Sequence, residues 1–361
     1  MADILIQHLI KSFGTSRAVE DVSLDVKDGE FAVFLGPSGS GKTTLLRCIA
    51  GLEKPDAGTV SIGGKDMTGI PARDRQISMV FQNYALFPLM TARNNIGFPL
   101  RVRGTSKEAT EKKVMDLAKR LGIEGLLDKR PKQLSGGEQQ RVAIGRALIR
   151  ETKAILMDEP LSNLDAPLRA QLRMELKALQ RDFGRTIVYV THDQVEAMTL
   201  ADRIGVMRSG RLLQYDAPRS VYASPSSSFV AGFVGSPPAS ILRLKVRNDG
   251  DSLSVVGQGI DLTVPDAFKG ALRSREGGEV VVAIRPEGIE VAQTPGAGIQ
   301  GTVELVEQLG ANTIIDLKVG DSVLRSIAAG DFEAQPGARV WARIDLAQAG
   351  FFDPITDRRL I

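Results

Sequence analysis

The sequence predicts an α/β fold in which helices cover a parallel β-sheet, followed by a smaller β domain. Four continuous apolar runs have the composition of strands buried on both faces of a sheet: 31–36, 77–81, 154–159 and 186–191. Segments with helical periodicity, such as 166–183, alternate with these runs, which is typical of a parallel sheet. Beyond residue 235 the sequence pattern changes to short strands of alternating apolar and polar residues, separated by glycine-rich turns. We expect a small β-barrel there.

Bulk composition fits a water-soluble protein with two domains. The chain has 361 residues, and a hydrophobic fraction of 43% leaves room for a sizeable core. A net charge of +3 gives no reason to expect a nucleic-acid partner. A single cysteine, Cys48, excludes an internal disulfide and fits a reducing compartment. The start has no basic leader, and no apolar run approaches the ~20 residues of a spanning helix.

A cluster of turn-forming residues indicates where the domains divide. The stretch "VGSPPAS" (234–240) ends any regular element, because two prolines follow Gly-Ser. We therefore predict domains at 1–235 and 236–361, with a helical subdomain at about 88–150. Within it, Thr105 and Glu108 predict a capping box at the start of a helix. Its apolar face is Val114, Leu117, Ala118 and Leu121.

Residues 36–43, "GPSGSGKT", match the pattern G-x-x-x-x-G-K-[ST] between a strand and a helix. Glycines let backbone N–H groups wrap around phosphates at the positive end of a helix dipole. Lys42 would meet the β- and γ-phosphates, and Thr43 would ligate Mg²⁺. The alternative is a glycine-rich turn without a ligand. The predicted contacts to the nucleotide are Gly36, Pro37, Ser38, Gly39, Ser40, Gly41, Lys42, Thr43 and Thr44.

Two further strand ends carry polar groups toward the same edge of the sheet. Asp158 ends one apolar run and would hold Mg²⁺, while the adjacent Glu159 could polarise an attacking water. His192 follows the run 186–191 and would face the γ-phosphate from that edge. The acidic pair could also be a simple helix cap, and a lone histidine after a strand is often structural.

A second glycine-paired stretch, "LSGGEQQR" (134–141), lies far from the first. A helix that begins after Ser135 has free N–H groups and a partial positive charge at its tip. Gly136 and Gly137 would allow phosphate oxygens a close approach, and Ser135 adds a hydroxyl. Ser135 and Glu138 also match S-x-x-E, a capping box that needs no ligand.

With these motifs in this order, the sequence resembles the ATP-binding cassette (ABC) family. The series is the P-loop at 36–43, Gln82 in "VFQNYALFP", the signature at 134–139, "ILMDEP", "SNLD" at 162–165, and His192 in "THDQ". The resemblance implies a P-loop NTPase cassette that pairs head to tail with a second copy as a homodimer. Each ATP would then lie between the P-loop of one subunit and the signature of the other. The family more often has Gln at the position of Glu138.

The resemblance also implies roles for single residues. Phe13 would stack on the adenine, and Asp165 would support the partner's catalytic site. Gln82 would sense Mg²⁺ and the attacking water. The implied catalytic residues are Glu159, His192, Gln82 and Lys42, and the implied ligands of Mg²⁺ are Thr43, Gln82 and Asp158. Outside the P-loop the nucleotide would contact Phe13, Gln82, Ser135, Gly136, Gly137, Glu138, Asp158, Asp165 and His192.

The stretch "NYALFPLM" (83–90) is unusually apolar for a loop. Its larger side chains, Tyr84, Leu86, Phe87 and Leu89, could be buried core. The resemblance instead implies a groove near Gln82–Leu89 where two separate permease subunits dock. A periplasmic solute-binding protein would complete the assembly, and the chain would lie at the cytoplasmic face of the inner membrane.

The tail resembles the C-terminal OB-like (TOBE) domain of bacterial importer ATPases, closest to the carbohydrate (maltose-type) branch. The segments concerned are 283–290, 303–313 and 350–360. This implies an ATP-hydrolysing subunit that energises uptake of a solute, a carbohydrate in the first instance. Polyamine, ferric iron, phosphonate and glycerol-phosphate importers are alternatives, as are a soluble non-transport ABC ATPase and a module with an inert site. The domain could regulate the protein or only pair the subunits.

Overall fold

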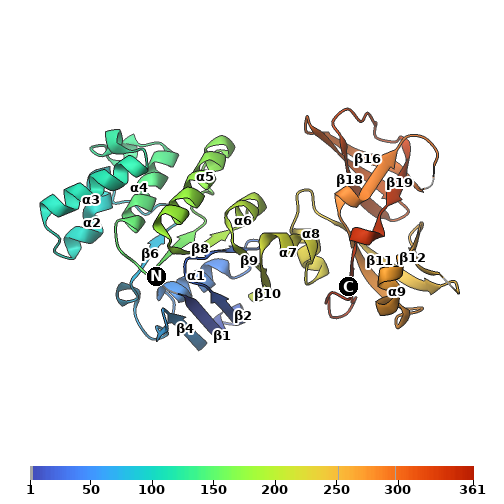
Figure 1. Ribbon diagram of the computed structural model, residues 1–361, viewed down its shortest axis with the longest axis horizontal. Helices are drawn as coiled ribbons and strands as arrows, with labels where there is room; N and C mark the ends of the chain where they lie inside the picture. The colour runs from blue at the N-terminus through green and yellow to red at the C-terminus, as the bar shows by residue number, and fades with distance from the viewer. Residues whose placement is uncertain (1–2, 251, 297) are drawn as a thin grey trace. The chain divides into compact units, whose positions relative to one another are not determined.

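The computed structural model describes residues 3–250, 252–296 and 298–361, and Figure 1 shows their elements in chain order. Contacts between Cα atoms divide the chain into two compact units, one ending at Pro218 and the other starting at Arg219. The first unit holds the phosphate-loop motifs, and the second holds the whole β-rich tail.

The first unit is built on a six-stranded sheet in the order β10-β9-β3-β8-β7-β6. Its strands are β3 (Phe31–Leu35), β6 (Ile77–Val80), β7 (Ala154–Asp158), β8 (Thr186–Thr191), β9 (Arg203–Arg208) and β10 (Arg211–Asp216). All neighbours pair in parallel except β10, which runs antiparallel to β9. Every residue of β3, β7 and β8 is buried, as their continuous apolar composition predicts. The predicted parallel sheet is confirmed.

A second, antiparallel sheet in this unit was not predicted. Its order is β2-β1-β4-β5, with β1 (Ile4–Phe13), β2 (Ser16–Val26), β4 (Ala57–Ile62) and β5 (Lys65–Asp66). Helix α1 (Lys42–Ala50) shares one apolar core with both sheets through Leu45, Leu46 and Ile49. Cys48 is fully buried in the same helix. The start of α1 is therefore held firmly where β3 ends.

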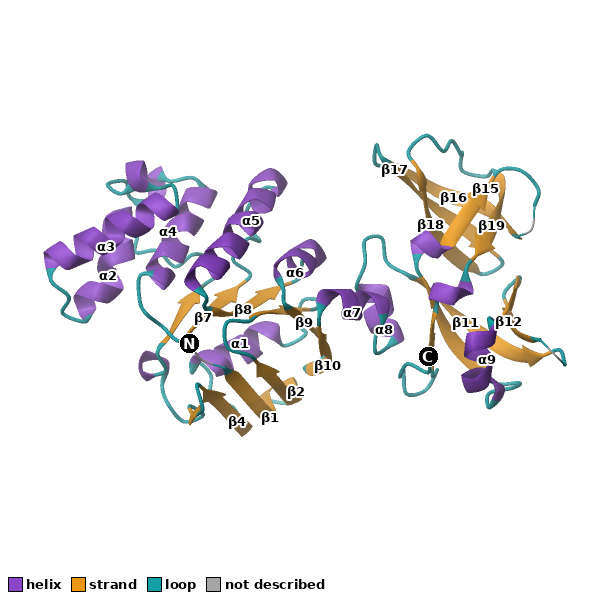
Figure 2. Ribbon diagram, in the orientation of Figure 1, coloured by secondary structure: helices purple, strands orange, loops and turns teal. Residues whose placement is uncertain are grey.

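Helices cover the parallel sheet and form a separate cluster, as Figure 2 shows. Helix α5 (Ala166–Phe183) has the predicted bounds, and α6 (Gln194–Leu200) packs on β3 and β8. The cluster consists of α2 (Ala92–Val102), α3 (Lys107–Arg120) and α4 (Gly136–Leu148). The predicted apolar face of α3 is buried, but its cap is Ser106, whose hydroxyl accepts from Ala109 N–H, and not Thr105. The predicted cap is wrong by one residue.

The second unit contains two five-stranded antiparallel sheets around one core. One has β11 (Ser240–Asn248), β12 (Leu253–Gly257), β13 (Ile260–Thr263), β14 (Glu279–Ile284) and β20 (Gly350–Phe352). The other has β15 (Ile289–Ala292), β16 (Ile299–Gln308), β17 (Asn312–Val319), β18 (Ser322–Ala329) and β19 (Arg339–Ile344). Its edge strands β15 and β18 lie against each other, so this sheet curls into a nearly closed barrel, as predicted. The helices are α7 (Pro218–Ala223), α8 (Ser228–Phe233) and α9 (Asp266–Arg273).

Candidate functional site

The loop between β3 and α1 requires glycine at two positions. Gly41 caps α1 with φ of +99°, and a Cβ there would lie 2.1 Å from the Ala18 carbonyl oxygen. A Cβ on Gly36 would lie 2.3 Å from the Met207 carbonyl oxygen. Only glycine tolerates such contacts without moving the backbone. Close contacts with the neighbouring strands thus restrict the backbone of this loop at both of its ends.

Lys42, the first residue of α1, turns its side chain back into the loop. Its Nζ donates to the carbonyl oxygens of Gly36 at 2.8 Å and Pro37 at 3.0 Å. The side chain is almost completely buried, and this burial lowers the pKa of Lys42 while the nearby carboxylates of Glu159 and Asp158 act in the opposite direction. The loop therefore surrounds a cationic group that faces two acidic residues.

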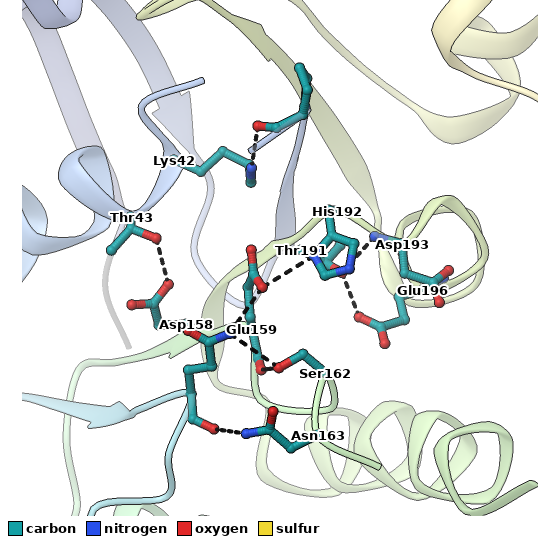
Figure 3. A network of polar contacts seen from close by, with 12 residues as sticks. Lys42, Thr43, Asp158, Glu159, Ser162, Asn163, Thr191, His192, Asp193 and Glu196 are labelled. Atoms are coloured by element: carbon teal, nitrogen blue, oxygen red, sulfur yellow. Dashed lines mark hydrogen bonds and ion pairs between the residues drawn. The ribbon is translucent and has the colours of Figure 1, made fainter. Parts of the chain in front are cut away.

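Asp158 and Thr43 bring two oxygen donors together at the end of β7. Thr43 Oγ1 donates to Asp158 Oδ1 at 2.9 Å (Figure 3). Burial raises the pKa of Asp158, while the bond from Thr43 opposes that rise. Residues 3–250, 252–296 and 298–361 contain no cluster of three His, Cys, Asp or Glu side chains that could hold a metal alone. A hydroxyl and one carboxylate nevertheless fit Mg²⁺, which commonly takes its other ligands from phosphates and water.

Three predicted catalytic side chains meet beside this pair. The Oε2 atom of Glu159 lies 3.1 Å from His192 Nδ1 (Figure 3). The same oxygen lies 3.4 Å from Gln82 Nε2. Glu159 has a φ of +42°, a costly conformation for a residue with a side chain. Its N–H donates to the Val190 carbonyl at 3.0 Å and holds the residue in this conformation. Strain of this kind accumulates where a side chain must point in a fixed direction.

The signature residues form a separate cluster. Ser135 N–H donates to Glu138 Oε2 at 2.7 Å, and Glu138 N–H donates to Ser135 Oγ at 3.4 Å, which completes a capping box at the start of α4. These hydrogen bonds stay within the motif and do not reach the P-loop. A Cβ on Gly137 would lie 2.5 Å from Leu168 Cδ2, and one on Gly136 would lie 3.2 Å from Leu164 Cδ2. The packing of α4 against Leu164 and Leu168 therefore favours glycine at both positions, independently of any bound phosphate.

Two more predicted residues, Phe13 and Asp165, are exposed to solvent. Phe13 ends β1 with 49% of its surface exposed, and Lys11 Nζ lies 5.1 Å from its ring centroid. Asp165 is exposed and caps α5, with its Oδ1 accepting from Leu168 N–H at 2.9 Å. Within the described part of the chain, neither residue forms a hydrogen bond with Glu159, His192 or Gln82. Both are accessible to a ligand or to a partner.

Several polar residues around the site were missed by the sequence analysis. Asn163 Nδ2 donates to the Gln82 carbonyl at 3.0 Å and fixes the loop that carries Gln82. Arg169 and Asp193 form an ion pair at 3.2 Å, and Glu196 is buried behind His192. The D-x-x-E spacing of Asp193 and Glu196 marks a helix start, but it does not reveal that Glu196 turns inward.

The apolar loop 83–90 is divided between core and surface. Tyr84 is buried, whereas Phe87 is 39% and Leu89 is 84% exposed. A groove of about 300 Å³ is open beside it, lined among others by Phe81, Phe87, Phe98, Pro99 and Arg146. In the part of the chain that the structure describes, no helix has the length and apolarity needed to cross a membrane.

The chain is similar to known proteins over its full length. The family model described as ABC transporter matches residues 19–162, and the TOBE domain model matches 282–352. The chain is 44% identical to the sulfoquinovosyl glycerol transport ATP-binding protein SmoE of Agrobacterium fabrum, with both chains covered completely. It is also 44% identical, over both full lengths, to the trehalose/maltose import ATP-binding protein MalK of Thermococcus litoralis. A dimeric bacterial ABC transporter cassette matches 60% of this chain and 99% of its own, with 34% identity and a TM-score of 0.54.

Proposed function

The chain belongs to the ABC transporter family of ATP-binding proteins, and on that premise we propose that it binds and hydrolyses ATP to energise a bacterial solute importer. The observation that carries the proposal is the convergence of Glu159, His192 and Gln82 beside the Asp158–Thr43 pair. It joins a polarising carboxylate, a histidine and a metal-ligand set at one edge of a parallel sheet, next to a phosphate-binding loop.

The catalytic assignments rest on geometry. The Glu159 side chain is 18% exposed, and its Oε2 atom is held by His192 and Gln82, so we assign Glu159 as the general base. Lys42 and the N–H groups of the P-loop hold the phosphates, and His192 contacts the γ-phosphate. Thr43, Asp158 and Gln82 would hold Mg²⁺, which would neutralise phosphate charge when bound. Phe13 offers an exposed ring on which the adenine stacks.

The complete site needs two copies of the chain. Ser135, Gly136, Gly137 and Glu138 lie at the start of α4, and the capping-box hydrogen bonds of Ser135 and Glu138 stay within the motif, so a two-fold partner brings the signature to the phosphates across a dimer interface. The N–H groups of Gly136 and Gly137 are the ones that the capping box leaves for a phosphate. A dimeric cassette among the similar structures supports this arrangement. Hydrolysis removes the phosphate that the signature holds and lets the pair open.

The transported solute is assigned from the relatives. One acts in sulfoquinovosyl glycerol transport and one in trehalose and maltose import, and sn-glycerol-3-phosphate import ATP-binding proteins are also 43–44% identical. We therefore assign the chain to a carbohydrate importer, with glycerol phosphate as the second candidate. Two permease subunits dock at the loop 83–90 on the cytoplasmic face of the membrane, and a periplasmic binding protein delivers the solute.

The decisive experiment measures phosphate release by the purified chain with Mg–ATP. Activity per molecule should fall on dilution, because a shared site works only in the dimer. Chelation of Mg²⁺ with EDTA should abolish hydrolysis. Constant activity per molecule at concentrations where only monomers remain would show that the site is not shared. Uptake of labelled maltose against labelled glycerol phosphate, in vesicles with the cognate permease, then decides between the two solutes.

A further inference from the structure

Behind His192 the structure contains a polar network that no recognised motif describes. Glu196 is 2% exposed, and its Oε2 accepts from Tyr189 Oη at 2.8 Å and from Thr191 Oγ1 at 2.7 Å. Thr191 Oγ1 in turn accepts from Asp193 N–H at 2.9 Å. Figure 3 shows Thr191, His192, Asp193 and Glu196 together. The network fixes the backbone on both sides of the histidine, so His192 is attached to a rigid turn.

One side chain connects this turn to another functional loop. Arg169, on the first turn of α5, donates from Nη1 to Asp193 Oδ2 at 3.2 Å and from Nη2 to the Leu164 carbonyl at 2.9 Å. Leu164 directly precedes Asp165, whose exposed side chain caps the same helix. The guanidinium thus bridges the loop 162–165 and the turn that carries His192.

The bridge is stiff because a guanidinium is planar and holds its donors in a fixed fork. A shift of the Leu164 carbonyl therefore moves the guanidinium, and through Asp193 the shift reaches His192. Among the described residues, Arg169 Nε is buried without a hydrogen-bond partner. The Nη1 and Nη2 bonds are therefore the only hydrogen bonds that the described residues offer to this guanidinium, and its position depends on both loops.

We propose that Arg169 is a positioning residue that couples the loop 162–165 to His192. The inference rests on the proposed function, in which His192 meets the γ-phosphate, and on the role that the family resemblance implies for Asp165, which is to support the partner's catalytic site. A change at the dimer interface would then alter the histidine of the same chain. Arg169 contacts neither nucleotide nor metal in this scheme, and it acts only through the two loops.

The test uses the full-length protein and the small number of histidines. The chain has two, His8 and His192, so His8→Asn leaves His192 as the sole source of imidazole signals in NMR spectra. Asn suits position 8 because His8 has a φ of +49°, which asparagine tolerates. In this background Arg169→Gln should move the His192 ring resonances beyond their line width. It should also lower kcat by about 10- to 100-fold, as displaced catalytic groups do, with KM for ATP almost unchanged.

Four further variants keep the test decisive. Arg181→Gln, at an exposed position of the same helix, should change neither the resonances nor kcat. Asp193→Asn keeps a capping side chain for α6 but removes the ionic acceptor, so it should reproduce the Arg169→Gln effects. The double variant should then be no worse than either single one. If Arg169→Gln does not fold, Asp193→Asn and Arg169→Lys carry the test.

Two results separate this inference from the proposed function. Unchanged His192 resonances and kcat in Arg169→Gln or Asp193→Asn, even with a lower Tm, would overturn the coupling and leave ATP hydrolysis standing. A wild-type protein that does not hydrolyse Mg–ATP would refute the proposed function, whatever the histidine signals show.

Discussion

The Glu159 carboxylate and the His192 imidazole contact each other directly, with Oε2 3.1 Å from Nδ1. The two residues follow neighbouring parallel strands, β7 and β8, whose carboxyl ends meet at one sheet edge. Glu159 reaches the histidine from a backbone conformation with a φ of +42°. The contact therefore depends on strand order and on one strained residue, and it brings together the two side chains that we propose as the general base and the γ-phosphate contact.

Glu159→Gln should produce an ATP-bound dimer that scarcely turns over. Glutamine keeps the size and the hydrogen bonds but cannot take a proton, and removal of a general base costs about 10²- to 10⁴-fold in rate. Phosphate release and size-exclusion chromatography with Mg–ATP measure the two effects. Glu151→Gln, with its side chain 85% exposed, is the matched control and should behave as wild type. Hydrolysis by Glu159→Gln at the wild-type rate would remove Glu159 from the mechanism.

Ser135→Arg should abolish hydrolysis and leave nucleotide binding by the monomer intact. The bulky cation would block the start of α4, where the partner's phosphate is expected, but it lies apart from the P-loop. Loss of the N-cap alone costs about 1 kcal/mol. Ser106→Arg, which removes the cap of α3, therefore serves as control and should retain hydrolysis. A fluorescent ATP analogue measures binding, and its loss in Ser135→Arg would argue against a site shared between subunits.

Asp158→Asn should make the nucleotide-free protein more stable at neutral pH. Burial raises the pKa of Asp158 above its ordinary value of 3.8, so the native state binds more protons than the unfolded state between the two values. Wild-type stability is therefore lost as the pH rises through this window. Asparagine does not ionise, so its advantage is full above the window and shrinks as the pH falls through it.

Calorimetry in EDTA at about pH 7.5 and about pH 5 measures this difference. Asp182→Asn, at an exposed position of α5, is the control and should show little change. Mg–ATP should stabilise wild type more than Asp158→Asn, because the carboxylate then gains a cation. If Asp158→Asn were less stable than wild type at neutral pH, burial of the ionised Asp158 carboxylate would not lower the free energy of unfolding.

The sequence predicted best where one local pattern determines the structure. Continuous apolar runs located β3, β7 and β8, and the run-terminal residues Asp158 and His192 lie together at the sheet edge as expected from parallel pairing. The sheet containing β1 was missed, because β-bulges shift its register and break the alternation of apolar residues. The cap of α3 was misplaced because Thr105 and Ser106 are both good caps, and only the backbone distinguishes them.

Contacts between distant segments could not be predicted from local patterns. Arg169 and Asp193 are 24 residues apart, and their pairing depends on how α5 packs beside α6. Glu196 has the sequence context of a first-turn helix residue, yet its side chain is buried against Tyr189. The packing of Gly137 on Leu168 likewise appears only when two helices are placed together. Such tertiary contacts are invisible to periodicity and spacing.

Leu89→Asp should leave basal ATP hydrolysis unchanged and abolish solute uptake in the reconstituted transporter. The side chain is 84% exposed, so its replacement costs little stability, typically within about 0.5 kcal/mol. A charge there would oppose an apolar partner on the loop 83–90. Met174→Asp, with 65% exposure on α5, is the control and should support normal uptake. Normal uptake by Leu89→Asp would exclude this loop as the docking surface.

Gly137→Ala should destabilise the protein although alanine favours helices. Alanine gains about 1 kcal/mol of helix propensity over glycine. Its Cβ, however, would lie 2.5 Å from Leu168 Cδ2, 3.1 Å from Cδ1 and 3.2 Å from Cγ, so the whole side chain must move. Overpacking of this kind costs about 1–3 kcal/mol, which exceeds the gain.

The control for this steric argument is Gly270→Ala in α9, where a Cβ would meet nothing within 4 Å. It should raise the free energy of unfolding by up to about 1 kcal/mol, measured by urea denaturation. Leu168→Ala opens the space that Gly137→Ala needs, so the double variant should lose less stability than the two single losses together. Strict additivity would mean that Gly137 is not constrained by Leu168, and the glycine would then be explained by the close approach of a phosphate alone.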